Sequence, residues 1–226
     1  MNKKLSSTRL HAINRQTNER YGKRLRERGP GAHALGWGTR RFQVKRFNDL
    51  LHAVGTDAFH GKRVLDIGCG LGDLYSFLLK KGIRPSRYEG VDVNPEFIAL
   101  AKRAFRSRRT ATFKARDLML QPLHGHLPDT GVALGVINFK QANHEAYAMQ
   151  FMTACFASVK ETLVVNVISA LRNGRYPKES FIYYYDPAAW LKWAQTLTPF
   201  CSLIHDYAGE PQREFFLILR KTPWNA

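Results

Sequence analysis

Residues 64–74 read VLDIGCGLGDL, in which an apolar run ends at Asp66 and three glycines follow at alternate positions. An apolar strand that leads into a glycine loop and then a helix is typical of α/β sheets, where the glycines let the backbone approach a ligand closely. The dinucleotide fingerprint G-x-G-x-x-G needs a glycine where this chain has Asp73, and no Gly-Lys-Ser/Thr of a P-loop follows. Because a carboxylate at a helix start opposes bound phosphate, the loop favours a ligand that lacks phosphates and carries positive charge.

After residue 60 the sequence alternates between strand-like and helix-like segments. This alternation predicts an α/β fold in which helices cover both faces of a largely parallel sheet and ligands bind at the carboxyl ends of the strands. The last two strand-like stretches, separated by AGEPQ at 208–212, predict a hairpin. The expected strands lie at 62–67, 87–93, 110–115, 131–137, 162–169, 199–207 and 213–221.

Helix signals occupy the spaces between these strands. Asn94 is suited to cap a helix that begins at Pro95, and Asp186 is suited to cap another that begins at Pro187. A further helix is expected over about 144–159.

The first 60 residues stand outside this alternation, so we divide the chain into a basic helical extension, 1–60, and a domain over 61–226. We expect the extension to cover the ligand edge of the sheet, as a lid or as part of a substrate site. Its first dozen or so residues are expected to be disordered. Apolar residues at helical spacing, followed by Gly55, predict one helix in the extension: Phe47, Leu50, Leu51 and Val54.

The formal net charge of +17 is concentrated in two segments. Residues 1–46 contain 13 Lys and Arg against two acids, and residues 102–116 contain seven Lys and Arg and no acid. Such segments fit a polyanionic partner such as RNA, whose phosphates they would neutralise. They fit two solvated basic faces equally well, and the sequence leaves both interpretations open.

Three cysteines, Cys69, Cys155 and Cys201, are far apart and are not accompanied by histidines at ligand spacing. This pattern opposes a disulfide framework and a metal site and fits a reducing compartment. There is no apolar run of about 18 residues that would predict a membrane span, and the basic N-terminus lacks the apolar stretch of a signal peptide. We therefore expect a cytoplasmic protein with no metal and no membrane partner.

The loop at 64–74, followed by YEGVDVNPEFIALAKRAF at 88–105, resembles the cofactor-binding half of class I S-adenosylmethionine-dependent methyltransferases. The resemblance is close over about 60–140 and keeps the right order to the end of the chain. The sequences GWG at 36–38 and YYYDP at 183–187 resemble a bacterial group of that family with undefined substrate. The resemblance implies a Rossmann-like three-layer sandwich, a mostly parallel seven-stranded sheet with an antiparallel last strand, and S-adenosylmethionine as cofactor.

By this resemblance, Asp66 and the glycines surround the methionine part of the cofactor, Asp92 accepts hydrogen bonds from the ribose hydroxyls, and Asp117 accepts one from the adenine amine. A carboxylate near the loop also suits a neighbouring ammonium or sulfonium group. Each aspartate fits an ordinary turn or helix cap as well. The expected cofactor-binding residues are Asp66, Gly68, Cys69, Gly70, Gly72, Asp73, Asp92, Val93, Asn94, Arg116, Asp117, Leu118 and Asn138.

Asn138 ends the fourth strand, where the resemblance places a residue facing the transferred methyl group, and it is our one catalytic candidate. The residues after it are Phe-Lys-Gln rather than the Pro-Pro-aromatic of enzymes that methylate nucleobase amines, which weakens that acceptor class. Asn138 fits a helix cap equally well. The expected substrate-binding residues are Tyr21, Trp37, Tyr183 and Tyr185.

Three functions remain open at this point. The first is methyl transfer to a small molecule, with the N-terminal helices as a lid; the aromatic candidates and the lack of a recognisable RNA-binding module favour it slightly. The second is methylation of RNA, with the basic N-terminal arm and residues 102–116 contacting phosphates. The third is nucleotide binding by a Rossmann-like protein without catalysis, because glycine-loop matches include false positives.

Overall fold

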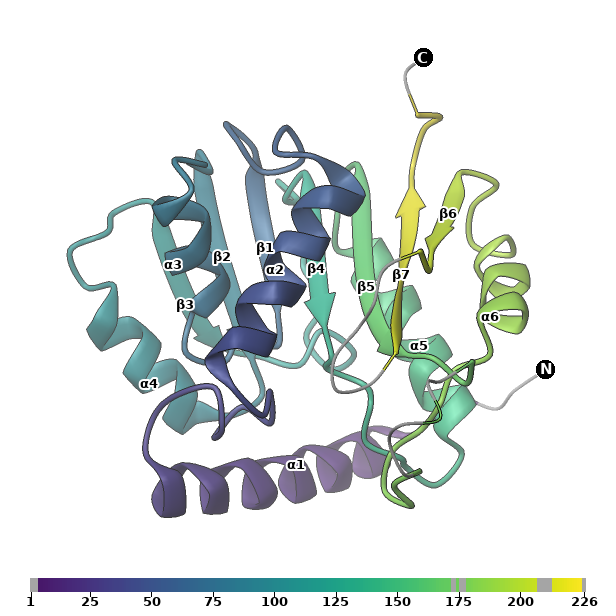
Figure 1. Cartoon of the computed structure of the whole chain (residues 1–226), viewed down its shortest axis with the longest axis horizontal. Coiled ribbons are helices and arrows are strands. Elements are labelled where there is room, and N and C mark those ends of the chain that lie inside the picture. The colour runs from purple at the N-terminus through teal and green to yellow at the C-terminus, as the bar shows by residue number, and fades with distance from the viewer. Residues whose placement is uncertain (1–3, 172–173, 175–177, 207–212, 225–226) are drawn as a thin grey trace.

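The computed structural model describes residues 4–171, 174, 178–206 and 213–224. Its centre is a seven-stranded sheet in the order β3-β2-β1-β4-β5-β7-β6 (Figure 1). Neighbouring strands from β3 to β5 are parallel, whereas β7 is antiparallel to both β5 and β6. The predicted fold class is confirmed. The strands are β1 Arg63–Ile67, β2 Arg87–Asp92, β3 Ala111–Ala115, β4 Thr130–Leu134, β5 Thr162–Ile168, β6 Cys201–Ile204 and β7 Glu214–Arg220.

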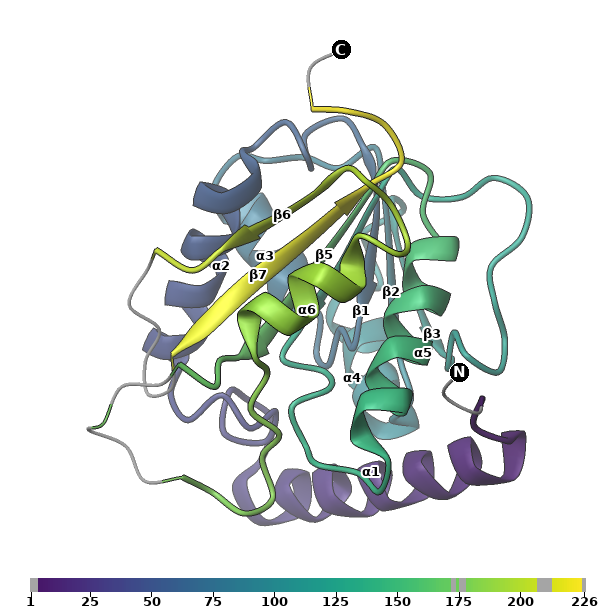
Figure 2. The ribbon, with the colours of Figure 1, turned by 90° about the vertical axis from the view of Figure 1, so that its right-hand side faces the viewer.

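Helices cover both faces of this sheet, and Figure 2 shows α2 and α5 on opposite sides of it. Within the described part of the chain, no helix combines the length and apolarity needed to cross a membrane. The helices are α1 Ser7–Arg28, α2 Arg40–Val54, α3 Asp73–Lys80, α4 Pro95–Ala104, α5 His144–Ala157 and α6 Pro187–Ala194.

Each central strand supplies side chains to two cores, because successive residues of a strand point to opposite faces. Val164 of β5 packs with residues of α2, α3 and α4. Its neighbours Leu163 and Val165 pack with residues of α5 and α6. Burial on both faces explains why these strands are continuous apolar runs rather than alternating ones.

The parallel strands end at one edge of the sheet, and α1 lies across that edge (Figures 1 and 2). Leu10 and Ile13 of α1 are 2% exposed and belong to the same core as Leu118 and Ile137, which follow β3 and β4. The carboxyl ends of the strands therefore face a helix rather than open solvent.

The order of the N-terminus corrects one expectation. The sequence predicts disorder over about the first dozen residues, but Ser6 caps α1 and the helix continues from there. The N–H of Leu5 donates to Gln150 Oε1 of α5 at 2.9 Å. The helix is held by two buried side chains, Leu10 and Ile13, in an otherwise polar sequence, so its apolar pattern is too sparse to be recognised without its partners.

The helix signals in the rest of the chain are confirmed. Asn94 Oδ1 accepts from two backbone N–H groups at the start of α4, and Asp186 does the same for α6. Helix α2 ends at Val54, and Gly55 follows with φ 76°. The closing strands β6 and β7 pair in antiparallel register, whereas the predicted turn at 208–212 lies outside the described residues.

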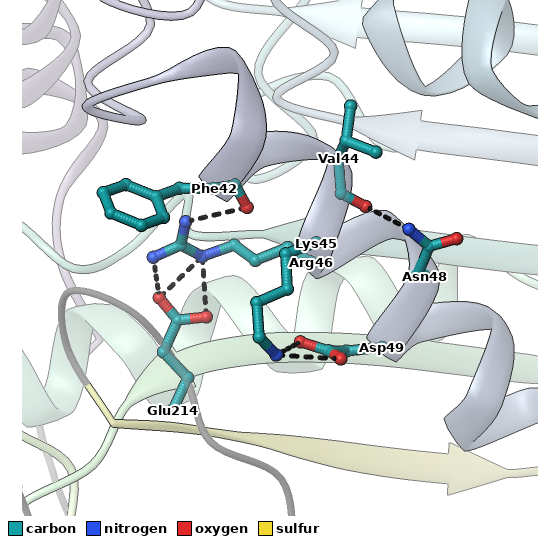
Figure 3. Close-up of polar contacts among 7 residues, drawn as sticks. All are labelled: Phe42, Val44, Lys45, Arg46, Asn48, Asp49 and Glu214. Atoms are coloured by element: carbon teal, nitrogen blue, oxygen red, sulfur yellow. Dashed lines mark hydrogen bonds and ion pairs between the residues drawn. The ribbon is translucent and has the colours of Figure 1, made fainter.

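A buried ion pair joins α2 to β7 (Figure 3). Arg46 Nε lies 2.7 Å from each carboxylate oxygen of Glu214, and Arg46 Nη2 contacts one of the same oxygens. The two side chains are 8% and 1% exposed. Charges buried this deeply remain stable in the fold only while the partner offsets their lost hydration, so the pair fixes α2 over the sheet.

Replacing Glu214 by alanine leaves the Arg46 guanidinium buried without its carboxylate. We expect the free energy of unfolding to fall by about 3–5 kcal/mol, measured by urea denaturation followed by circular dichroism. The control is Asp49→Ala on the same helix, which removes the more exposed Lys45–Asp49 pair of 2.8 Å (Figure 3) and should cost at most about 0.5 kcal/mol. Equal losses in the two variants would contradict this assignment.

Candidate functional site

The glycine loop after β1 packs against the segment that precedes α2. Gly68 and Gly70 have φ values of 73° and 52°, a left-handed conformation that residues with side chains rarely adopt. A Cβ atom would lie 2.5 Å from Val136 Cγ2 at the first position and 2.6 Å from Leu35 Cδ2 at the second. Both glycines are therefore required by conformation and by space.

A cavity of about 350 Å³ lies between this loop, α1 and the ends of the strands. Its size is that of a small-molecule site, for which about 300–1,000 Å³ is usual. The structure brings most of the sequence-predicted site residues to its walls. Those that line it are Asp66, Gly68, Cys69, Gly70, Asp73, Asp92, Val93, Arg116, Asp117, Leu118, Asn138, Tyr21 and Trp37.

Two predicted cofactor-binding residues, Gly72 and Asn94, lie outside the cavity lining. A Cβ atom at Gly72 would lie 2.6 Å from Phe105 Cε2, so this glycine serves the packing of α3 on an aromatic cluster. The buried side chain of Asn94 caps α4. Both residues shape neighbouring turns without facing the cavity.

The structure also places Tyr183 and Tyr185, predicted as substrate-binding residues, outside the cavity lining. Tyr185 is fully buried, and its hydroxyl donates to the carbonyl oxygen of Ile137 at 2.7 Å. The Tyr183 ring stacks on His144 at 4.0 Å, and its hydroxyl donates to Glu145 at 2.9 Å. Both tyrosines attach the segment before α6 to α5.

Asp66 ends β1 inside the cavity wall and is 4% exposed. Burial raises the pKa of Asp66 to about 7; the hydrogen bond from the Tyr88 hydroxyl opposes this shift, and the charges of Asp92 and Asp73 add to it. This carboxyl group therefore titrates near neutral pH. A cation beside it would stabilise its charged form.

Asp92 ends β2 and is held by the backbone. Its Oδ2 accepts from the N–H of Gly70 at 2.9 Å, and its Oδ1 accepts from the N–H of Asn94 at 2.8 Å. Burial raises its pKa, and these backbone hydrogen bonds lower it. The bonds join the ends of β1 and β2 and fix the orientation of the carboxylate at the cavity wall.

Asp117 follows β3 and meets α1. Its Oδ2 accepts from Asn14 Nδ2 at 2.8 Å, and its Oδ1 accepts from the N–H of Met119 at 2.8 Å. One turn further along α1, Asn18 Nδ2 donates to the carbonyl oxygen of Val93 at 3.0 Å. Two asparagines at helical spacing thus attach α1 to the ends of β3 and β2.

Asn138 is buried at the end of the segment that follows β4. Its Oδ1 accepts from the N–H of Ile168 at 3.2 Å, and its carbonyl oxygen accepts from the N–H of Tyr183 at 2.9 Å. The alternative role as a helix cap is wrong, since α5 begins at His144 with Asn143 in the capping position. The amide oxygen of Asn138 holds the ends of two strand segments together.

Helix α2 and the loop before it form the wall opposite α1. The Arg46 guanidinium lies 4.9 Å from the centre of the Trp37 ring, and a Cβ atom at Gly135 would lie 3.1 Å from the same ring. Arg40 donates to Asp73 at 2.6 Å, where α3 begins. The wall is therefore attached to the glycine loop and to the end of β4.

The end of the cavity between α1, the segment after β4 and the segment before α6 is lined by aromatic rings and a cationic side chain. The rings of Tyr21 and Phe139 meet edge to face at 5.8 Å, and Phe139 stacks with Phe181 at 6.0 Å. Arg24 of α1 lines the same end. The sequence gives Phe139 no role, because no local signal shows which ring α1 contacts. The site residues that were not predicted from the sequence include Asn14, Asn18, Arg24, Leu35, Phe139 and Phe181.

Comparison with known proteins yields a family and a fold. A family model described as "Methyltransferase domain" matches residues 64–162. Rv1506c of Mycobacterium tuberculosis, provisionally named a methyltransferase, is 25% identical over 161 residues, which cover 69% of this chain and 91% of the relative.

Solved structures with the same fold include enzymes for very different acceptors. Magnesium protoporphyrin IX methyltransferase from Synechocystis PCC 6803, crystallised with SAH, superposes with a TM-score of 0.66 and 16% identity over 94% of this chain and 99% of its own. The small RNA methyltransferase HEN1 superposes with a TM-score of 0.62 and 17% identity over 80% of this chain and 25% of its own.

The matching family model and the relative are both described as methyltransferases. This is evidence against our alternative hypothesis of a nucleotide-binding protein without catalysis. The matched segment contains the glycine loop, Asp92 and Asp117, the parts of the sequence from which the resemblance was drawn. Residues 64–162 thus match a methyltransferase domain, and the chain has the Rossmann-like fold of class I methyltransferases that use S-adenosylmethionine.

Proposed function

We propose that this enzyme transfers the methyl group of S-adenosylmethionine to a small molecule bound in the cavity under α1. The observation that carries the proposal is that the N-terminal segment covers much of the cavity. Helix α1 lies across the carboxyl ends of the strands, and Leu35 and Trp37 cover the glycine loop and Gly135. An acceptor must therefore fit a space of about 350 Å³ that it shares with the cofactor.

The residues around the glycine loop fit the cofactor chemically. We assign Asp66, Gly68 and Gly70 to its methionine part, Asp92 to the ribose hydroxyls and Asp117 to the adenine amine. Each oxygen of Asp92 and Asp117 accepts a hydrogen bond from the protein. A carboxylate oxygen has capacity for a second hydrogen bond, which the cofactor can donate. The bound cofactor supplies a methyl group on a cationic sulfur, which suits a site with acidic walls.

The chain's contribution to the reaction is positional. Methyl transfer is an in-line displacement that needs the acceptor atom aligned about 3–3.5 Å from the methyl group in a dry site. Within the proposal, residues 1–60 act as the lid that excludes water, and Tyr21 and Trp37 line the acceptor space from that lid. Asn138, whose amide oxygen is bound to the Ile168 N–H, orients the strand ends at the site rather than acting as a base.

A second candidate, methylation of RNA, is favoured by one observation. The C-terminal end of α1, which lies in the first basic segment, contacts α4, at whose end the second basic segment begins. Arg26 of α1 pairs with Glu96 of α4 at 3.5 Å, and Pro30 borders the same shallow hollow as Arg103 and Arg106. This juxtaposition would offer phosphates one continuous basic surface.

We also propose a cytoplasmic location. The cysteines Cys69, Cys155 and Cys201 are free, and the first two are buried. Unpaired thiols of this kind fit a reducing compartment.

Affinity for S-adenosylmethionine should rise with pH across about 7 and then level off. Asp66 has a pKa of about 7 in the free protein, and a bound cation lowers it, so binding below this pH must release a proton. We expect an increase of about tenfold between pH 6 and 8 by isothermal titration. Asp66→Asn should remove most of this dependence and weaken binding at pH 8. A pH profile of the variant parallel to that of the wild type would contradict the assignment.

Tyr88→Phe should move this pH profile. The lost hydroxyl donates to the charged form of Asp66, so its removal raises the pKa further and displaces the affinity midpoint upward by about one pH unit. The control is Tyr75→Phe, whose ring packs on Tyr88 at 4.6 Å but whose hydroxyl is bonded to Thr110. A shift of similar size in the control would show that packing, not the hydrogen bond, sets the midpoint.

The RNA candidate predicts steeply salt-dependent binding. A fluorescently labelled single-stranded RNA should lose at least about tenfold in affinity between 50 and 200 mM salt, and the double variant Arg103→Glu/Arg106→Glu should abolish binding at low salt. The matched double variant Lys160→Glu/Lys192→Glu changes charge away from α1 and α4 and should retain binding. If the wild type binds no RNA at low salt, the candidate is excluded.

A further inference from the structure

Arg24 presents a cationic group to the cavity that the fold itself does not use for an ion pair. It lines the cavity from α1, and its Nη1 atom is buried with no hydrogen-bond partner among the described residues. A guanidinium group has five N–H donors and keeps its charge in a protein. Arg24 as a whole is half-buried, but its Nη1 atom is shielded from solvent and unmatched, and such a donor marks a place where an anion would be bound.

The space beside this guanidinium is kept open by a glycine. Gly36 has φ 79°, and a Cβ atom there would lie 2.7 Å from Arg24 Nη1. The residue therefore permits both the local backbone conformation and the position of the guanidinium. Because residues 35–38 also cover the glycine loop, Arg24 lies at the roof of the same cavity.

Most acidic groups of the cavity are engaged elsewhere, and Glu179, which also lines it, forms no ion pair with Arg24. Glu214 pairs with Arg46, Asp73 pairs with Arg40, and the Asp92 carboxylate is held by backbone N–H groups. Within the described residues no carboxylate forms an ion pair with Arg24. The charge of Arg24 is thus left for a ligand.

Aromatic rings surround the cation. Its Cζ atom lies 5.6 Å from the centres of both the Tyr21 and Phe139 rings, and Arg20 lies 4.2 Å from the centre of Phe139. Phe139 and Phe181 stack nearly parallel, with 26° between their planes. Flat apolar walls beside an unpaired guanidinium favour a ligand that has a planar apolar body and an anionic end.

We propose that Arg24 binds the anionic group of the methyl acceptor, and that the acceptor is a small planar molecule bearing a carboxylate or a phosphate. This rests on the proposed function, since it assigns the acceptor end of the same cavity. Tyr21, Phe139 and Phe181 contact the apolar body. Arg24 determines specificity and positions the acceptor without taking part in the displacement.

The test is isothermal titration of the full-length protein, first with S-adenosylhomocysteine and then, in its presence, with three probes: benzoate, phenyl phosphate and the neutral benzamide. We expect at least one anion to bind about tenfold more tightly than benzamide, and the better of the two identifies the kind of anion. Arg24→Met should lower anion affinity to the level of benzamide and leave S-adenosylhomocysteine affinity unchanged. The matched control Arg28→Met, exposed on the same helix, should behave as the wild type.

Three results would overturn the inference: neither anion binds better than benzamide, Arg24→Met binds anions as tightly as the wild type, or Arg24→Met loses S-adenosylhomocysteine affinity. The last result would assign Arg24 to the cofactor. Failure of the wild type to bind S-adenosylhomocysteine would instead remove the proposed function, which makes the two failures distinguishable. If Arg24→Met does not fold, Arg24→Lys is the alternative variant, because it keeps the charge. It should weaken anion binding about threefold or more and leave benzamide binding unaffected. Anion affinity equal to that of the wild type would then count against the inference.

Discussion

Neighbouring parallel strands bring three carboxylates to one cavity: Asp66, which is buried, and Asp92 and Asp117, which are half-buried. The energetic cost of removing these groups from water is the constraint on which the site depends. A buried carboxylate is stable only where donors replace its lost water. Asp92 has two backbone donors, and Asp117 has a backbone donor and Asn14 of α1. Asp66 has the Tyr88 hydroxyl, and burial still raises its pKa to about 7. The end of the loop at Asp66 is therefore where a cationic ligand gains most.

The same constraint explains why α1 and α2, which precede the alternation of strands and helices, belong to the site. Helix α1 supplies Asn14 to Asp117 and Asn18 to the end of β2. Helix α2 is held by the Arg46–Glu214 and Arg40–Asp73 pairs, which connect it to β7 and to α3. Together the two helices keep bulk water away from the carboxylates, and a dry, preorganised site is what methyl transfer requires of the protein.

The features that the sequence predicts depend on residues close together in the chain. The features that it does not predict are contacts between residues far apart in the chain. The strands, the caps at Asn94 and Asp186 and the glycine loop follow from signals within a few residues. Helix α1 has a sparse apolar face that is recognisable only against its partners on the sheet. Tyr183 was expected at the substrate, but its segment packs on α5, a contact that no local signal shows. The role of Arg24 depends on a glycine twelve residues away along the chain, a pairing that no periodicity reveals.

The net charge of +17 and the charge inside the cavity act on different ligands. Exposed arginines such as Arg103 and Arg106 act through solvent, where interactions are screened over about 8 Å at physiological salt, so they influence which macromolecules approach. In our proposal Arg24 acts at contact distance in a partly enclosed cavity, where its unmatched Nη1 disfavours a neutral ligand. If the acceptor is the small molecule that we propose, its selection depends on the walls of the cavity and not on the abundance of basic residues elsewhere. A fold shared with enzymes for porphyrins and for small RNAs leaves that choice to the same few residues.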